Sequence, residues 1–495
     1  MSVLEFKHSP QTKWCLDLRA VAVVRILLGI GLLFDLYLRC QVLQAYYSEY
    51  GMVPAIGLGE QGFPNTIWSI HTLPTNYAEL IILICIEAIV YISFTLGLFT
   101  KLSNIASLFL ILSAQYRNVL VLNGADQLMR MLIFWLIFTP SGRLFSLDRL
   151  IFKRSVPNYI SFIPSIALII QVSSIYIFGA ITKESREWWI SGEAVYLAFQ
   201  IDTLAKAPAV WLRQYPEILR YVNYFTVYTE LLIGIAVWMR TQWRPAAIFL
   251  LLAGFCLHIG FFTFLIVGPF AYMNVVALII LTPSWVWDKV AVYVKVFRLN
   301  MSTIYSYRYS WLKLPVNGFV ICCVIWISTK NLSSISWYPM QVPSPVEEWG
   351  YYIGLQQEWR FFAPKPPLDD LWPVLRFTLA DGRVVNAIDT SLPADPLVKP
   401  KLISASWLNY KEQKLWANLA DFQTFQMQSL AYHYSLWNKT HTGSQKVIFG
   451  QMMYVYETTT LPNEKAIPLM VRSVASLGNE RKFKDLSKQY QYPER

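Results

Sequence analysis

Nine apolar runs, separated by short polar segments, occupy the first two thirds of the chain. They cover residues 20–39, 78–99, 103–121, 128–140, 160–181, 218–239, 245–267, 270–287 and 312–329. A helix that crosses a bilayer needs about 20 mostly apolar residues and satisfies its own backbone hydrogen bonds. The pattern predicts an all-α polytopic membrane bundle of about nine transmembrane helices. The short run at 128–140 and the run at 103–121, which contains Gln115 and Arg117, fit this pattern least well.

The pattern changes beyond residue 330. A proline-rich linker at 339–345 is followed by an alternating stretch, 374–385, with a central Asp-Gly pair that signals a β-hairpin. Residues 447–458 also predict a strand, whereas residues 405–437 predict helix. These elements predict a small C-terminal α+β domain. The expected domains are a cytoplasmic lead (1–19), a transmembrane domain (20–330) and an extracytoplasmic domain (335–495).

Composition and charge agree with a membrane protein. Only 15% of the residues are charged, against about 25% in soluble domains. The net charge of +11 comes largely from basic residues in alternate loops, whereas segment 40–77 has no Lys or Arg. The basic loop residues are Lys7, Lys13, Arg19, Lys101, Arg143, Arg149, Lys153, Arg154, Arg240, Arg244, Lys289, Lys295, Arg298, Arg308 and Lys313. The positive-inside rule then places the N-terminus in the cytoplasm, and nine spans place the C-terminal domain outside.

Two classes of function are disfavoured by the residue types. Because the basic residues are spread over short loops, nucleic-acid binding is not expected. The six cysteines show no CxxC pair and no Cys/His ligand spacing, so no metal site is predicted. The first apolar run lacks a cleavage site and contains Arg25 and Asp35, which indicates a retained helix rather than a removed signal peptide.

Ionisable residues inside the apolar runs are costly and therefore mark candidate sites. Asp35 and Arg39 are four residues apart in the first run and are expected to pair on one helix face. Asp126 and Arg130 repeat that spacing, and Glu230 and His258 lie in later runs. Each of the charged groups is as consistent with a structural ion pair as with function, whereas a lone histidine such as His258 is more often a structural residue than a ligand or a base. The expected topology collects them into a polar pocket open to the outer face.

Lys183 follows the apolar stretch 175–181 and precedes Trp188 and Trp189. Such neighbours can desolvate an amine. Desolvation lowers the pKa of a lysine, so that the amine can act as a base or a nucleophile. The other interpretation is a lysine that extends to the membrane interface. The residues alone favour the interfacial anchor.

Several stretches together resemble a known family. They are Arg25, Asp35 and Arg39 with 47–54, then 123–126 with 146–148, 176–183 with Trp188, His258 with 268–272, and 359–364 with 381–383. In order and spacing they resemble the vitamin K-dependent γ-glutamyl carboxylase superfamily, and more closely its bacterial branch of HTTM (horizontally transferred transmembrane) domain proteins. The resemblance implies a multi-pass protein of the bacterial inner membrane with a periplasmic C-terminal domain.

The resemblance also implies site residues. Lys183 matches the carboxylase lysine that deprotonates vitamin K hydroquinone. The catalytic histidine of the carboxylase falls on Ala125, which cannot transfer protons, so glutamate carboxylation is not expected. A pocket for a quinone, a hydroquinone or a lipidic molecule is still implied. Its expected lining is Asp35, Arg39, Asn123, Asp126, Arg130, Glu230, His258 and Tyr272.

Three functions stay open from the sequence. The first is a quinol-linked membrane enzyme with Lys183 as its base. The alternative is a non-enzymatic scaffold or maturation factor that acts on a periplasmic or membrane protein partner through residues 335–495. A transporter ranks last, because transporters often contain internal repeats and no repeat is visible here.

Overall fold

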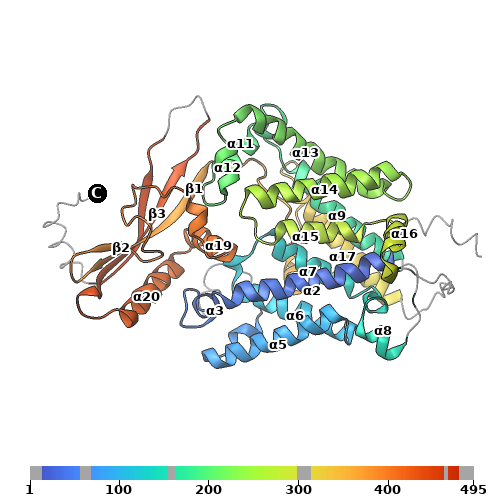
Figure 1. The fold of residues 1–495 in the computed structure, drawn as a ribbon, viewed down its shortest axis with the longest axis horizontal. Coiled ribbons are helices and arrows are strands. Elements are labelled where there is room, and N and C mark those ends of the chain that lie inside the picture. The colour runs from blue at the N-terminus through green and yellow to red at the C-terminus, as the bar shows by residue number, and fades with distance from the viewer. Residues whose placement is uncertain are drawn as a thin grey trace, which may run out of the picture.

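The computed structural model describes residues 14–55, 68–153, 156, 160, 162–297, 314–461 and 467–478. They form a helical bundle joined to a smaller domain that contains a β-sheet (Figure 1). The predicted fold class, a helical membrane bundle followed by a C-terminal domain with strands, is thus confirmed in its main features. Residues 1–13 of the predicted lead and the basic residues Arg154, Arg298, Arg308 and Lys313 lie outside the described residues.

Each predicted apolar run contains a helix. The bundle helices are α2 (Leu18–Cys40), α5 (Tyr77–Leu96), α6 (Thr100–Arg117), α7 (Gly124–Leu136), α9 (Phe162–Ile181), α13 (Pro216–Met239), α14 (Arg244–Phe264), α15 (Phe270–Ile280), α16 (Ser284–Tyr293) and α17 (Leu314–Leu332). Helix α2 packs against α5, α7 and α15, and α9 packs against α13 and α17. Shorter helices connect them: α3 (Leu43–Tyr47), α8 (Leu147–Phe152), α10 (Arg186–Trp189), α11 (Ala194–Phe199) and α12 (Ala207–Leu212).

Six of the described helices are long and apolar enough to cross a membrane. They are α2, α5, α9, α13, α14 and α17, and the pair α15–α16 is a seventh candidate although it is bent by 98°. Helix α7 has only 13 residues, and α6 buries Ser103, Asn104 and Ser107 against its neighbours instead of presenting an apolar surface all round. The predicted total of nine spans therefore stays a prediction.

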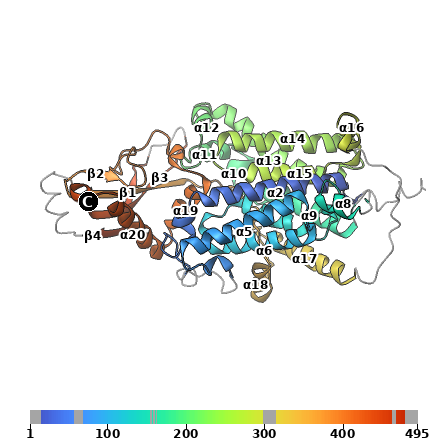
Figure 2. The same ribbon diagram turned by 60° about the horizontal axis from the view of Figure 1, so that its bottom comes forward.

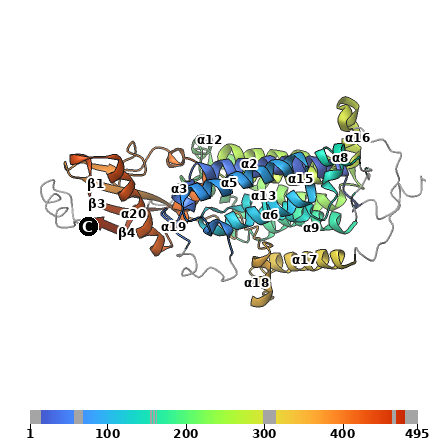
Figure 3. The ribbon, with the colours of Figure 1, turned by 90° about the horizontal axis from the view of Figure 1, so that it is seen from below.

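The two ends of the bundle carry different elements. Arg19, at the start of α2, forms an ion pair of 2.8 Å with Asp288 of α16. At the other end of α2, Asp35 contacts Lys411 of the C-terminal domain at 2.8 Å. Figures 2 and 3 show α8 and α16 at the end of the bundle opposite to the sheet. The start of α2 and the C-terminal domain thus lie at opposite ends.

The C-terminal domain is an antiparallel sheet with strand order β2-β1-β3-β4. The strands are β1 (Asp369–Leu379), β2 (Val384–Asn386), β3 (Val447–Thr458) and β4 (Met470–Gly478). Helices α19 (Tyr410–Leu419) and α20 (Gln423–Thr440) pack on this sheet, and α18 (Ser344–Tyr352) precedes it. The predicted hairpin and the strand at 447–458 are confirmed, whereas the predicted helix at 405–437 is broken at residues 420–422 into α19 and α20.

The C-terminal domain is fastened to the loop between α11 and α12. The hydroxyl of Thr203 donates to Asp370 at 2.5 Å, and the hydroxyl of Ser404 donates to the Ala205 carbonyl at 2.5 Å. Asp202, Asp370 and Glu457 place carboxylate oxygens within 4.8 Å of one another. The amine of Lys399 forms ion pairs with two of these acids, Asp202 and Glu457, and so supplies positive charge to the group.

Candidate functional site

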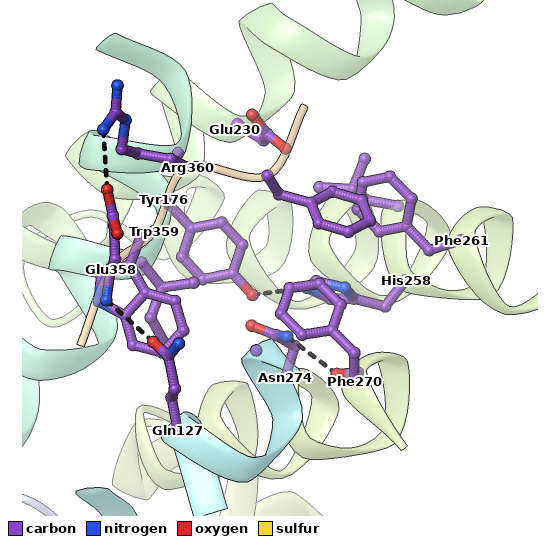
Figure 4. Close-up of a pocket in the computed structure, with 15 residues that line it drawn as sticks. Gln127, Tyr176, Glu230, His258, Phe261, Phe270, Asn274, Glu358, Trp359 and Arg360 are labelled. Carbon is purple, nitrogen blue, oxygen red and sulfur yellow. Dashed lines mark hydrogen bonds and ion pairs between the residues drawn. The ribbon is translucent and has the colours of Figure 1, made fainter. Parts of the chain in front are cut away.

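A cavity of about 240 Å³ lies inside the bundle and is closed on one side by the chain that follows α18. Its lining comes from α7, α9, α13, α14 and α15 together with residues 358–361 (Figure 4). We call it the polar cavity, and its lining residues are Gly124, Gln127, Ile175, Tyr176, Gly179, Glu230, Leu257, His258, Phe261, Phe270, Asn274, Glu358, Trp359, Arg360 and Phe361. Binding sites for small molecules commonly combine apolar walls with a few convergent polar groups.

Polar side chains of α9, α14 and α15 form hydrogen bonds in the wall of this cavity. The hydroxyl of Tyr176 on α9 lies 2.7 Å from Nε2 of His258 on α14. Asn274 on α15 donates through its Nδ2 to the Phe270 carbonyl at 2.9 Å. Nδ1 of His258 and Oδ1 of Asn274 are buried and have no hydrogen-bond partner among the described residues. Because buried polar atoms are normally paired, these two atoms mark a place where a water or a polar group of a ligand would bind.

Aromatic rings form another part of the cavity wall, beside His258. The rings of Phe361 and Phe270 are stacked, with centroids 5.3 Å apart and planes inclined by 21°. Phe261 meets Phe361 edge to face at 5.6 Å. Stacked and edge-to-face aromatic pairs leave flat apolar surfaces that suit a planar ring.

Residues 356–362 are held in place by hydrogen bonds to the bundle. Arg130 donates to the Gln356 carbonyl, and the side chain of Gln171 donates to Gln357 at 2.7 Å. Gln127 accepts from the backbone of Glu358 at 2.9 Å, and the indole of Trp188 donates to the Phe362 carbonyl at 3.0 Å. The wall that carries Phe361 is thus a fixed part of the cavity.

Lys183 and Glu230 form a buried ion pair beside the cavity. The amine of Lys183 donates to Oε2 of Glu230 at 2.7 Å and to the Gly179 carbonyl at 2.5 Å, and it lies 4.9 Å from the ring centre of Trp188. These contacts occupy the ammonium group, which has three N–H donors. Glu230 lines the polar cavity, and the ion pair places Lys183 directly behind it. Lys183 therefore reaches this cavity through Glu230.

A second buried charge cluster lies where α2 and α7 meet the C-terminal domain. Arg39 pairs with Asp35 at 2.5 Å, and the amine of Lys411 lies 2.8 Å from Asp35 and 3.6 Å from Asp126. Burial by itself lowers the pKa of Lys411, but Asp126 and Asp35 outweigh it and raise this pKa well above its ordinary value. We call this group the junction cluster. Its charges balance, which is what a structural ion cluster requires.

The site residues that were predicted from the sequence thus lie at several separate places in the structure and not in one pocket. Glu230 and His258 line the polar cavity with Lys183 behind them, whereas Asp35, Arg39 and Asp126 belong to the junction cluster. Asn123 caps α7 by accepting from the Ala125 backbone at 2.8 Å, and Arg130 binds Gln115 at 3.0 Å. The Tyr272 hydroxyl donates to the Leu27 carbonyl at 2.7 Å, and Tyr272 does not line the polar cavity.

Four contributors to these sites were not identified from the sequence. Tyr176 and Phe361 lie in stretches that carry the family resemblance, but no role followed from the resemblance. Asn274 is a polar residue within the apolar run 270–287, which is the same kind of signal that marked Glu230. Lys411 lies in a polar segment, and nothing in its sequence neighbourhood distinguishes it from a surface lysine.

Comparison with known proteins identifies one family. The family model for the HTTM domain matches residues 15–285, more than half of the 495-residue chain. This range contains every residue of the polar cavity except the wall at 358–361. No curated protein and no solved structure matches the chain.

Proposed function

Because this chain belongs to the HTTM domain family and contains helices able to cross a bilayer, it is a membrane protein, and we propose that it binds a quinone-like amphiphile in the polar cavity. The observation that carries this proposal is the pair of unpartnered buried atoms, Nδ1 of His258 and Oδ1 of Asn274, in a cavity walled by aromatic rings. The bilayer is the proposed source of the ligand.

The polar groups favour a neutral head group that carries a hydroxyl. Oδ1 of Asn274 and the Glu230 carboxylate can only accept hydrogen bonds, so a ligand must supply a donor to them. An anionic head group would face both acceptors without a donor to offer, and the cation that lines the cavity, Arg360, is already paired with Glu358 at 2.9 Å. A ring hydroxyl supplies the donor, and its ring can pack against the stacked rings of Phe270 and Phe361.

Glu230 is the group best placed to exchange a proton with such a hydroxyl. Its carboxylate borders the polar cavity and accepts a hydrogen bond from the Lys183 ammonium at 2.7 Å. In this proposal Lys183 positions and neutralises Glu230, so that deprotonation of the ligand proceeds through the carboxylate. The family resemblance implies that Lys183 itself is the base. In this proposal Lys183 acts indirectly, through Glu230.

Glutamate carboxylation is not part of the proposal. Ala125, at the position of the carboxylase histidine, is wholly buried in the first turn of α7 and offers no proton-transferring group. Its neighbour Gly124 lines the polar cavity. The proposed reaction is therefore limited to binding, and reversible deprotonation, of the hydroxyl.

We further propose that the chain lies in a bacterial inner membrane with the C-terminal domain in the periplasm. The basic residues Arg19 and Lys289 belong to the bundle end opposite the C-terminal domain, in agreement with the positive-inside rule. Accessibility of single cysteines to a membrane-impermeant thiol reagent, at residue 439 and at residue 149, tests this orientation. Labelling at 439 alone is expected, and labelling at 149 alone would reverse the topology.

The function is tested by extracting small molecules from the protein purified in native lipid discs. Replacing both charges together (Lys183→Met with Glu230→Gln) keeps the buried site neutral, so that the fold is expected to persist. The matched control, Glu217→Gln, changes an exposed glutamate on the same helix α13. Mass spectrometry is expected to detect a ring-containing amphiphile that is at least tenfold depleted in the double variant only. Equal recovery from all three proteins, or no specific molecule in any, would contradict the proposal and favour a scaffold.

A further inference from the structure

A second cavity, of about 90 Å³, lies between α13 and α14 and meets the polar cavity. Glu230, Leu257, Phe261 and Phe361 line both of them. Apart from Lys183, Glu230, Thr226 and Cys256, the lining side chains of this second cavity are hydrocarbon or aromatic, and we call it the apolar cavity. The apolar cavity therefore adjoins Glu230, where the polar head of an amphiphile is proposed to lie.

The apolar cavity reaches the outer surface of the bundle. Phe225 on α13 lines it and is 51% exposed, and Cys256 on α14 lines it and is also exposed. Gly260, one turn beyond Cys256, lines it as well, and a methyl group placed there would meet no atom of the described residues within 4 Å. The missing side chain of Gly260 therefore leaves a notch between two helices.

The surface around this notch is suited to lipid. Helices α13 and α14 both have the length and hydropathy of membrane spans. Their outward residues are large and apolar, and include Leu232, Ile235, Leu252, Phe255, Ile259 and Phe262. A notch in such a surface opens into the hydrocarbon of the bilayer and not into water.

We infer that the gap between α13 and α14 at Gly260 is a lateral opening that receives the apolar tail of the bound amphiphile. The inference rests on the proposed function, because it takes the head group to lie at Glu230. The occupant is the tail and not a second head group, since the polar atoms in the apolar cavity already bind one another: Lys183 contacts Glu230, and Thr226 donates to the Val222 carbonyl at 2.8 Å.

The test fills the notch without touching the polar cavity. In Gly260→Leu the new side chain occupies the opening, and its cost to the fold is small because it meets open space and leucine favours helix. Gly318→Leu is the matched control, because Gly318 also lies in a membrane-span helix, α17, with open space at its Cβ. The probes are duroquinone, which has no tail, and decylubiquinone, which has an alkyl tail. Both are used in their reduced hydroquinone forms, which carry the ring hydroxyl that the polar cavity requires, and each is titrated against protein in lipid nanodiscs.

The two inferences fail in different ways. Gly260→Leu is expected to weaken the binding of decylubiquinone at least tenfold and to leave the binding of duroquinone unchanged. Gly318→Leu is expected to bind both probes as tightly as the wild-type protein does. If Gly260→Leu binds decylubiquinone as tightly as the wild-type protein, or loses affinity for both probes equally, the lateral opening is overturned but the proposed binding in the polar cavity is not. Failure of the wild-type protein to bind either probe would overturn the proposed function and the opening with it.

The wild-type protein offers an independent measurement. If a tail lies in the opening, decylubiquinone slows alkylation of Cys256 relative to Cys322, an exposed cysteine on α17. Duroquinone is expected to leave the ratio of the two rates unchanged. An unchanged ratio with decylubiquinone at saturating binding would place the tail elsewhere.

Discussion

The amine of Lys411 lies 2.8 Å from the carboxylate of Asp35, although one residue belongs to the C-terminal domain and the other to the first membrane helix. Neither side chain reaches solvent, with exposures of 0% and 1%. A buried charge that loses its partner is costly, and here the partner is supplied by a different domain. The bundle and the C-terminal domain are therefore expected to be stable only together.

Removal of the Lys411 amine tests that dependence. In Lys411→Met, Asp35 and Asp126 keep two buried carboxylates against the single charge of Arg39, so we expect a loss of about 3–5 kcal/mol in the free energy of unfolding. The measurement is the midpoint of thermal unfolding in detergent. Lys439→Met, at an exposed position on α20, is the control and is expected to leave the midpoint unchanged.

Charge balance can be restored in the same cluster. Adding Asp126→Asn to Lys411→Met removes the surplus carboxylate, and the double variant is expected to recover part of the lost stability. A double variant that unfolds at the temperature of the single variant would show that Lys411 acts through packing and not through charge.

Stability is expected to depend on charge balance in the same way at the Lys183–Glu230 pair inside the bundle. Each single variant, Lys183→Met and Glu230→Gln, leaves one buried group without its partner, and we expect the lysine change to cost about 3–5 kcal/mol. The double variant should be more stable than Lys183→Met. Thermal unfolding of the three proteins measures this, and a double variant less stable than both singles would contradict the ion-pair account.

Substitutions at two tyrosines distinguish an effect on ligand binding from an effect on stability. Tyr176→Phe removes the hydroxyl beside His258, and Tyr272→Phe removes a hydroxyl that donates to the Leu27 carbonyl. Each change removes one hydrogen bond, buried for Tyr176 and partly buried for Tyr272, so each is expected to cost about 1 kcal/mol of stability. Only Tyr176→Phe should weaken retention of the bound amphiphile, because Tyr272 does not line the polar cavity. Equal retention in the two variants would remove Tyr176 from the site.

Stability between about pH 4 and 6 should depend on Asp370. Burial raises the pKa of this carboxyl from 3.8 to about 6, and the hydrogen bonds from Thr203 only partly oppose the rise. Because the folded state holds the proton more tightly, the stabilising contribution is present below about pH 3.8 and is lost as the pH rises through about 6. A difference of about two pKa units corresponds to roughly 3 kcal/mol.

Asp370→Asn removes this titration. The unfolding midpoint of the variant, measured across the same pH range, is expected to fall less steeply with rising pH than that of the wild-type protein. Parallel curves for the two proteins would show that Asp370 does not bind a proton differently in the folded and unfolded states.

The sequence predicted the elements whose pattern is local. The apolar runs locate the long helices, because burial or lipid contact over about 20 residues leaves a continuous signal. The strand at 447–458 and the turn at Asp381-Gly382 were likewise predictable from alternation and turn chemistry. The break between α15 and α16 has a local cause as well, because Pro283 directly precedes α16 and lacks the N–H needed to continue α15.

The composition of the site was less predictable, since it depends on contacts between distant segments. Topology alone grouped Asp35, Arg39 and Asp126 with Glu230 in one pocket, but the structure brings Lys411 to the first three residues and residues 358–361 to Glu230. Lys411 is 376 residues from Asp35 along the chain, and no helical or strand periodicity relates such positions.

The central claim is that an amphiphile occupies the polar cavity with its head group at His258 and Asn274. The most direct test is an experimental density map of the protein in native lipid discs. We predict ring-shaped density in the polar cavity against the stacked rings of Phe270 and Phe361, within hydrogen-bond distance of Asn274 Oδ1, that continues toward Gly260. A cavity that holds only ordered water, or one filled by rearranged side chains, would contradict the claim.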